Sequence, residues 1–526
     1  MKNKQMYAME GGQTLLNKGF TLIELLAVIV ILAIIALIAT PTILGIINDV
    51  RVGARERSID NIIHAAEIYY AQEKMKDVNT SNKINIEDIK DKIDGEIPEG
   101  GYIIINEAGD AIFELEFKDK TYVKLFTGEI VEEPKNADKY YIKLATTTNG
   151  ETEPFLEGPI RKEQIEKITT VPTNKVPSDV IGYWDVTDTT NQSETGKVMV
   201  WYYDKDSNGL YEIYIGQEGR VKANPDSTKL FNYIINLKEI DLTYFDTSNV
   251  TNMWCLFQCC EDLEKIIGLE NFDTSSVENM RNIFNKCYKL QFLNLSSFDR
   301  SNVTTMHGMF QYCKSLTELD VSNFDTSNAE NMGLMFSNCH KLQSLNLSSF
   351  NTAKVTDMNS MFQNCLSLKE IDVSSFDTSN VVDMRLMFAG ADIDEVPQYM
   401  KLERIIGLEN FDTSQVTTMQ AMFQCCSSLT SLDVSKFDTG KVTTMKWMFN
   451  GCSNLTSLDI SNFDTNKVTD MSKMFNSTPN LKPIYIGEKW KTASTTTYMF
   501  GGTALTKSVD EMCGPNSTQE WCVSSN

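Results

Sequence analysis

Histidine is scarce in this chain. Only three occur in 526 residues, His64, His307 and His340, and they lie far apart in the sequence. A catalytic or metal centre built on imidazole needs such a side chain beside a nucleophile, an acid or further ligands. No such set converges in the sequence. We therefore expect no metal site, no cofactor and no enzymatic activity.

Positive charge is also in short supply. The 48 lysines and arginines stand against 71 aspartates and glutamates, so the net charge is −23. An acidic surface repels phosphate backbones, which argues against a nucleic-acid partner. The length leaves room for about two to four domains.

One long stretch lacks charge almost completely. From Phe20 to Ile47 there are 28 residues with a single formal charge, Glu24. A helix over this stretch would reach about 40 Å, enough to cross a bilayer. A carboxylate in lipid is costly and needs a partner. If the chain is cut between Gly19 and Phe20, the new ammonium of Phe20 can pair with Glu24 of a neighbouring chain.

The phrase Gly-Phe-Thr-Leu-Ile-Glu that begins at Gly19, followed by an apolar run with Pro41, resembles the amino terminus of type IV prepilins. The resemblance implies a leader over residues 1–19 that a membrane prepilin peptidase removes between Gly19 and Phe20. It also implies N-methylation of Phe20.

The same resemblance implies a helix over residues 20–47 that spans the membrane before assembly and later lies in a filament core. Phe20, Glu24 and Pro41 would then act in subunit assembly. A secretory signal peptide fits less well, because the Gly-Phe junction precedes the apolar run. A plain membrane anchor would leave Glu24 unexplained.

Residues 20–145 are predicted to form a pilin-like domain. Apolar residues at spacings of three and four between Ile59 and Tyr70 indicate that the helix continues past the membrane. A short helix is predicted over 84–93. Three strands are predicted at 102–106, 111–117 and 121–126. This pattern predicts a long helix covered by a small antiparallel sheet.

Residues 146–196 are rich in Thr, Asn, Pro and Glu and are predicted to be a linker with one short helix around 162–168. Residues 197–227 are predicted to form a hairpin and an N-terminal cap. The hairpin turn, 204–209, matches the first half of a calcium loop. The twelfth position is Ile215, where that loop needs a glutamate, so a plain Asn-Gly hairpin turn is favoured.

Residues 228–500 are periodic. A phenylalanine recurs every 26 residues, apart from one step of 27 and one of 35, at Phe245, Phe272, Phe298, Phe324, Phe350, Phe376, Phe411, Phe437 and Phe463. A fixed period with Leu-x-x-Leu-x-Val is typical of a leucine-rich-repeat solenoid. We expect about ten repeats, each with a strand such as Leu319–Val321 and a helical turn. The predicted fold class is thus α+β, a long pilin helix with a small sheet followed by this solenoid.

The repeat wording Phe-Asp-Thr-Ser-x-Val-Thr-x-Met-x-x-Met-Phe-x-x-Cys resembles the BspA-type leucine-rich-repeat surface proteins of bacteria, over roughly residues 180–500. The resemblance implies adhesion to an unknown surface protein or glycan. The outward strand residues expected on the concave face are Asp241, Asn294, Asp320, Asn346, Asp372, Asp433 and Asp459. They form either a solvated acidic ladder or a ligand face.

Seven cysteines occupy one fixed place in the repeats, at 260, 287, 313, 339, 365, 426 and 452. A ladder of buried thiols is the favoured interpretation, because free cysteine is among the most buried residues. Disulfides between adjacent repeats remain the alternative in an exported chain. Cys513 and Cys522, in a predicted C-terminal cap over 501–526, are further disulfide candidates.

These features together predict a type IV pilin-like filament subunit that displays an adhesion domain. The expected partners are other pilin subunits, the prepilin peptidase, the membrane before assembly and a surface ligand. The expected location is the cell membrane through a single span, then an extracellular filament. The alternative is a pseudopilin of a type II secretion or DNA-uptake machine.

Overall fold

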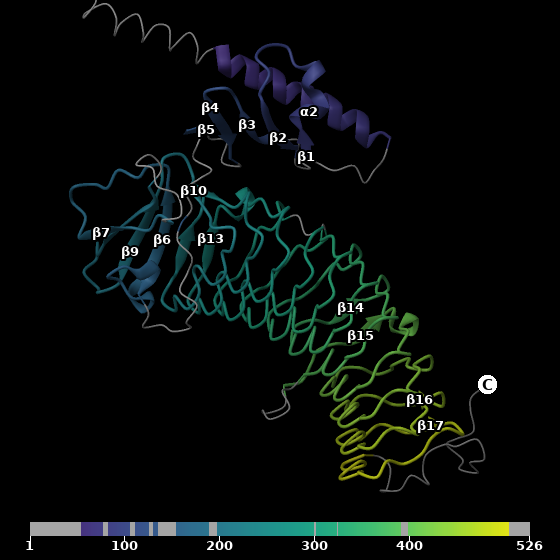
Figure 1. The fold of residues 1–526 in the computed structure, drawn as a ribbon. Coiled ribbons are helices and arrows are strands. Elements are labelled where there is room, and N and C mark those ends of the chain that lie inside the picture. Colours follow the sequence, from purple (N-terminus) through teal and green to yellow (C-terminus); the bar gives the residue numbers. More distant parts are fainter. Residues whose placement is uncertain are drawn as a thin grey trace, which may run out of the picture. The chain divides into compact units, whose positions relative to one another are not determined.

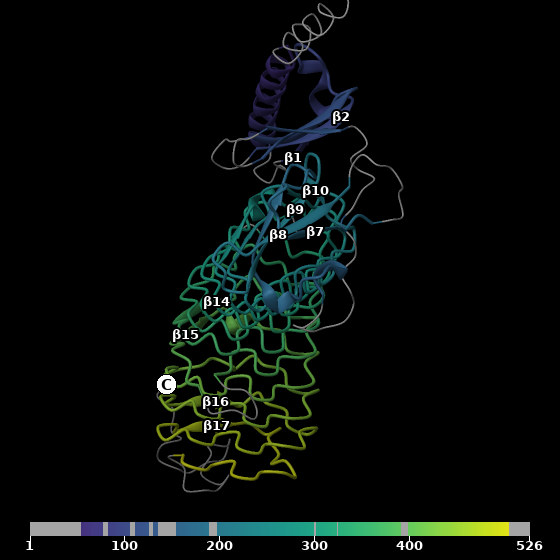
Figure 2. The ribbon, with the colours of Figure 1, turned by 90° about the vertical axis from the view of Figure 1, so that its left-hand side faces the viewer.

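A computed structural model gives the fold of the protein (Figures 1 and 2). It divides into two compact units, residues 1–117 and 118–526, and each is described by itself. The described residues are 54–76, 83–105, 111–125, 130–134, 142, 154–188, 197–298, 301–322, 324–390 and 398–503.

The first unit combines one helix with a small antiparallel sheet. The helix covers residues 54–74 and buries Ile59, Ile62 and Ala66. Strand β2 pairs antiparallel with both β1 and β3. The guanidinium carbon of Arg55 lies 4.1 Å from the ring centroid of Phe117, just past β3. The remaining elements are β1 (Lys83–Asn85), α2 (Ile86–Ile89), η1 (Lys90–Lys92), β2 (Gly100–Ile105) and β3 (Ala111–Glu116).

The predicted long apolar helix is not found in the part of the chain that the structure describes. The described α-helices are residues 54–74 and the single turn of α2. Residues 20–47, over which that helix is predicted, lie outside the described residues. The described helix over residues 54–74 exposes Glu56 and Arg57. No helix among the described residues has both the length and the apolar composition to cross a membrane.

The second unit begins with the antiparallel pair β4 (Lys120–Lys124) and β5 (Ile130–Pro134). It continues into a six-stranded sheet of order β13-β11-β6-β9-β8-β7. The four strands β13, β11, β6 and β9 run parallel to one another, whereas β8 and β7 are added antiparallel. The bounds are β6 (Ile165–Val171), β7 (Gly182–Asp185), β8 (Met199–Tyr203), β9 (Tyr211–Gly216), β11 (Glu239–Asp241) and β13 (Lys265–Ile267).

This sheet joins the cap to the first two repeats. The predicted hairpin over 198–215 is present as β8 and β9. The short helix predicted around 162–168 is wrong: a single 3-10 turn, η4 (Lys162–Gln164), leads directly into β6. Ile168 is fully buried and pairs with Ile240 of the first repeat, which explains why the segment is a strand. Two strands, β6 and β7, therefore lie within the range expected to be linker.

The repeats stack on one another through a regular backbone ladder (Figure 1). In each repeat one residue makes a parallel bridge to its equivalents in the repeats before and after, from Asp226 to Thr495. Alternate N–H groups then bond forward to the next repeat; for example, Phe310 N–H donates to the Met335 carbonyl at 2.9 Å. The intervening N–H groups bond back within their own turn, as Met309 does to Met306. Every repeat thus depends on its neighbours for half of these bonds.

The predicted fold class is wrong in the repeats as well. Among the described residues, strands at the Leu-x-x-Leu-x-Val position occur only in β11, β13, β14 (Glu370–Asp372), β15 (Arg404–Ile406), β16 (Leu458–Ile460) and β17 (Ile484–Ile486). The Met-x-x-Met-Phe segment is not helical, because residues such as Leu334 (φ 59°) and Asn338 (φ 63°) are left-handed. Left-handed residues recur in the other repeats and convert the expected helical turn into tight turns. The described chain is therefore mostly strands in several small sheets together with stacked turns.

A column of stacked rings runs through the repeats and is named here the phenylalanine stack. It comprises eleven rings, Phe231, Phe257, Phe284, Phe310, Phe336, Phe362, Phe388, Phe423, Phe449, Phe475 and Phe500. Successive centroids lie 5.6–5.8 Å apart with interplanar angles of 3–13°. These values are typical of offset stacking. All of the rings except Phe500 are essentially inaccessible to solvent.

A buried ion cluster marks the start of the stack. Strand β10 (Val221–Lys222) pairs with β12 (Phe245–Asp246). The carboxylate of Asp246 forms ion pairs with Lys222 and, at 3.3 Å, with Arg220. Burial opposes ionisation, but Arg220 and Lys222 outweigh it and hold the pKa of Asp246 below its usual range. The equivalent residue Asp438 lies on the surface. The cluster therefore belongs to the cap, not to the repeat.

Replacing a ring inside the phenylalanine stack should destabilise the repeats strongly. We expect Phe336→Ala to cost about 3–5 kcal/mol, because it removes a fully buried ring and leaves a cavity. Amide hydrogen exchange of the intact protein would show the loss in the mutated repeat and its neighbours. Phe292→Ala, at an exposed phenylalanine, is the control and should leave exchange unchanged. Equal effects of the two variants would contradict the role assigned to the stack.

Acid should weaken the Asp246 cluster. Because the folded pKa of Asp246 is lowered, its stabilising contribution is complete above about pH 4, the unfolded value, and is lost as pH falls towards the folded pKa. Asp246→Asn should cost about 3–5 kcal/mol at neutral pH, because it removes the buried carboxylate that Arg220 and Lys222 both contact. It should also flatten the dependence of the urea midpoint on pH between 6 and 3. Asp438→Asn should change neither quantity appreciably; a matching change there would refute the assignment.

Candidate functional site

The seven outward strand residues predicted as binding candidates share one local geometry. Each accepts a hydrogen bond from the residue two positions on; in Asp320, Oδ1 accepts from the N–H of Ser322 at 2.9 Å and from its hydroxyl at 2.6 Å. The other six are Asp241, Asn294, Asn346, Asp372, Asp433 and Asp459. These bonds close the turn after the strand position. The side chains thus have a structural role whether or not they bind a ligand.

Hydrogen bonds favour the charged form of two of these acids. The hydroxyl and N–H of Ser374 lower the pKa of Asp372, and those of Ser435 do the same for Asp433. Six of the seven residues are exposed and Asp241 is half-buried. The outward row therefore presents fixed negative charge to solvent.

The row is interrupted by apolar side chains. Asp241 has Ile267 as its partner in the next repeat, Asp372 has Ile406, and Asp459 has Tyr485. The structure therefore does not place all seven candidates in direct succession. A ligand that binds along this row would contact separate acidic patches and not one continuous acidic surface.

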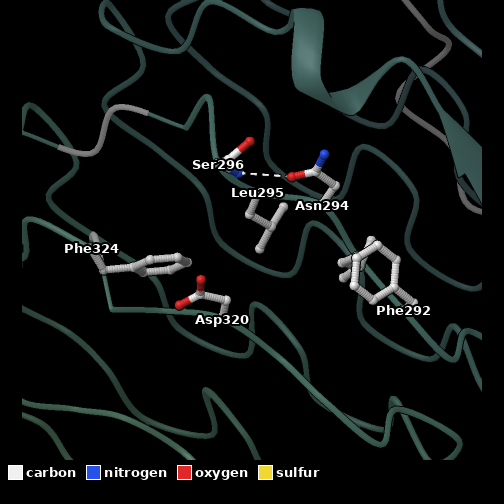
Figure 3. A pocket seen from close by; sticks show the side chains of 7 residues that line it. Phe292, Asn294, Leu295, Ser296, Asp320 and Phe324 are labelled. Atoms are coloured by element: carbon white, nitrogen blue, oxygen red, sulfur yellow. Dashed lines mark hydrogen bonds between the residues drawn. The ribbon is translucent and has the colours of Figure 1, made fainter. Parts of the chain in front are cut away.

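Two of the candidates, Asn294 and Asp320, meet at a pocket (Figure 3). The cavity has a volume of about 200 Å³. Its walls come from two consecutive repeats and consist of Phe292, Leu293, Asn294, Leu295, Ser296, Asp320 and Phe324. We call it the Phe292 pocket.

Strand-like alternation positions the side chains of the Phe292 pocket. Leu293 and Leu295 are buried, so Phe292 and Asn294 point outward. The ring of Phe292 is 66% exposed. The N–H of Ser296 donates to Oδ1 of Asn294 at 3.2 Å and so orients the amide. Asp320 faces the same hollow from the next repeat (Figure 3).

Sequence reasoning missed Phe292, although the signal was present. The equivalent outward position carries Glu318, Ser344 and Glu370 in other repeats. An aromatic residue at a position that the periodic pattern places in solvent is a departure from the repeat. A search for residues that all repeats share does not find a residue that occurs in one repeat alone.

The cysteine ladder is buried and reduced. All ten cysteines of the described ranges are free. Each of the seven at the fixed repeat position donates its thiol to a phenylalanine carbonyl in the preceding repeat, as Cys339 does to Phe310 at 3.2 Å. Burial raises the pKa of Cys260 and of Cys365 to about 12. The buried-thiol interpretation is confirmed for these residues, and the disulfide alternative is not.

The calcium-like turn is satisfied by its own backbone. Asp204 accepts from the N–H groups of Asn208 and Gly209, and Asp206 also accepts from Asn208. Gly209 is left-handed (φ 81°), as a hairpin turn requires. Within the described ranges no three or more His, Cys, Asp or Glu side chains are placed to hold a metal ion.

The predicted processing and assembly residues lie outside the described residues. These are Gly19, Phe20, Glu24 and Pro41, and the disulfide candidates Cys513 and Cys522 lie outside them as well. Their roles stay predictions.

Two protein-family models match the chain. The model described as "Prokaryotic N-terminal methylation motif" matches residues 15–40, so a prepilin-type amino terminus is confirmed. The model described as "Mycoplasma protein of unknown function, DUF285" matches residues 226–344, 313–397 and 393–511. Together these matches cover more than half of the chain, and they do not specifically support the BspA-type resemblance. The searches of curated proteins and of solved structures found no match.

The buried thiols should be nearly inert in the folded protein. At pH 8 we expect iodoacetamide to modify the ten described cysteines about a hundredfold more slowly than an exposed thiol, because burial blocks access and disfavours the thiolate. Intact-mass measurement after alkylation would count the modified sites. In guanidinium without reductant the same ten should react quickly. Resistance of the ladder cysteines in the unfolded chain would show disulfides and contradict the structure.

Proposed function

This chain belongs to the family described as "Mycoplasma protein of unknown function, DUF285", and we propose that it is a type IV pilin-like filament subunit that displays its repeats as a binding domain. The observation that carries the proposal is the presence of two segments on one chain. A prepilin methylation motif at residues 15–40 precedes a repeat region at 226–511 whose outward positions vary. The prepilin motif would allow the subunit to polymerise, and the repeat region would provide the surface that binds a ligand.

Assembly follows from the chemistry of the amino terminus. Cleavage after Gly19 creates the ammonium of Phe20, and Glu24 is the single formal charge among the 28 residues up to Ile47. In lipid an unpaired carboxylate is strongly unfavourable. Pairing with the ammonium of a neighbouring subunit removes that cost and sets the register between subunits. The peptidase, the membrane and other pilins are therefore the proposed partners of this end.

Binding follows from the design of the repeats. Buried rings and backbone hydrogen bonds hold each repeat on the next. The residues at exposed positions can therefore vary without loss of the fold. Such stacks commonly serve as extended recognition surfaces. The proposed role is adhesion at the cell surface rather than catalysis.

A pseudopilin of a secretion or DNA-uptake machine is the competing assignment, since its amino terminus has the same motif. Imaging of cells labelled for the repeats separates the two. Long extracellular fibres that carry the label support the proposal. Label confined to the envelope, together with a secretion defect in the deletion strain, would favour the pseudopilin.

Glu24→Ala should block assembly without blocking processing. We expect the leader to be removed normally, because cleavage occurs before the apolar run, while incorporation into sheared filaments falls at least tenfold. Immunoblots of membrane and filament fractions would measure both. Glu56→Ala, an exposed acid beyond the apolar run, is the matched control and should assemble normally. Undiminished incorporation of Glu24→Ala would remove the pairing role.

A further inference from the structure

We propose that the Phe292 pocket binds a lysine or arginine side chain of a partner protein. This inference rests on the proposed function, since it names the class of ligand that the displayed repeats recognise. The juxtaposition that carries it is an exposed aromatic ring, an exposed carboxylate and an oriented amide around one small hollow.

The aromatic ring supplies the apolar contact. Phe292 is 66% exposed at a position where the next two repeats carry Glu318 and Ser344. A single exposed phenylalanine would mean little by itself. Here it forms a wall of a cavity rather than a point on a flat surface. A cation within about 6 Å of such a ring is attracted by its negative face, and the methylene stem of lysine or arginine packs on the same ring.

The opposite wall supplies the charge. Asp320 is exposed, and its Oδ1 accepts from the N–H and the hydroxyl of Ser322, which orients the carboxylate. Glu318, exposed in the same repeat, occupies the position 26 residues beyond Phe292. Hydrogen bonds from an ammonium or guanidinium to such carboxylates are charge-assisted and stronger than neutral ones.

Two lysines near the pocket are paired with other acids. Lys265, in the preceding repeat, lies 3.6 Å from Glu239. Lys289, just before the pocket strand, pairs with Asp262 at 2.7 Å. These two lysines therefore already face an acid of their own. With a net charge of −23 the chain as a whole also attracts basic partners.

The size of the hollow indicates a side chain rather than a larger molecule. Its volume of about 200 Å³ lies below the range of about 300–1,000 Å³ typical of pockets for drug-sized ligands. One extended basic side chain can fill it while the rest of the partner lies across the outward row. Buried anchors of this kind often dominate protein interfaces.

The test uses the full-length protein in detergent, immobilised on a sensor surface. The probes are a Gly-Ser peptide with three spaced lysines, its arginine counterpart, and a counterpart with norleucine in their place. We expect the basic peptides to bind and the norleucine peptide not to bind. Phe292→Ala and Asp320→Asn should each weaken binding about fivefold or more, the scale of one lost cation–π or charged contact.

Matched variants separate the pocket from general acidity. Asp372→Asn removes the equivalent carboxylate from another repeat, where Ser374 makes the same bond, and should change affinity less than twofold. Phe292→Leu keeps an apolar side chain but removes the ring, so it should behave like Phe292→Ala. Rising salt should weaken binding of the basic peptides.

Three results would overturn the proposal. One is equal binding of the norleucine peptide. Another is a loss in Asp372→Asn as large as that in Asp320→Asn. The third is binding of a neutral oligosaccharide that depends on Phe292 when the basic peptides do not bind. The Phe292 variants should still enter filaments, so a failure here leaves the assembly role of Glu24 intact and separately testable.

Discussion

Stacking of one phenylalanine ring on the next is the constraint on which the repeat region depends. Centroid separations stay within 5.6–5.8 Å from Phe231 to Phe500, even across the step where the sequence spacing lengthens between Phe388 and Phe423. The extra residues therefore leave the register intact. The backbone bridges follow the same register, for example from Asp383 to Thr418. A shift of one residue would misalign rings and bridges together, so the period is strongly selected by packing.

A stack of identical units needs an end, and the cap supplies it. The sheet strand β6 pairs with β11 of the first repeat and continues its parallel ladder into the cap. Lys162 reaches into the core and donates to Oδ1 of the buried Asn232 at 2.7 Å. The Asp246 cluster closes the next layer. The cap thus supplies hydrogen-bonding and parallel-strand partners to residues of the first repeat.

Sequence alone could predict the register but not the backbone. The recurrence of Cys predicted one buried column. The phenylalanines that gave the register, Phe245 to Phe463, are not those of the phenylalanine stack, Phe231 to Phe500. The periodic pattern misidentified the elements, because spacings of three and three such as Val355, Met358 and Met361 fit a helical face and a series of tight turns equally well. Non-glycine residues in left-handed conformation, such as Leu334 and Asn338, decide between them, and their identity carries no local signal. The small sheet of the first unit was predictable because alternation over 102–117 has a single interpretation.

The candidate site shows the opposite limit. Periodic analysis finds what repeats share, whereas a binding site is made by what one repeat does differently. The shared acids, Asp372 and Asp433 among them, close turns and so would persist without any ligand. Phe292 is not a member of the phenylalanine stack, and its ring is largely exposed. When the fold explains the common residues completely, the unexplained exception is the better guide to recognition, and a fold fixed by its buried columns is free to place such exceptions anywhere along its surface.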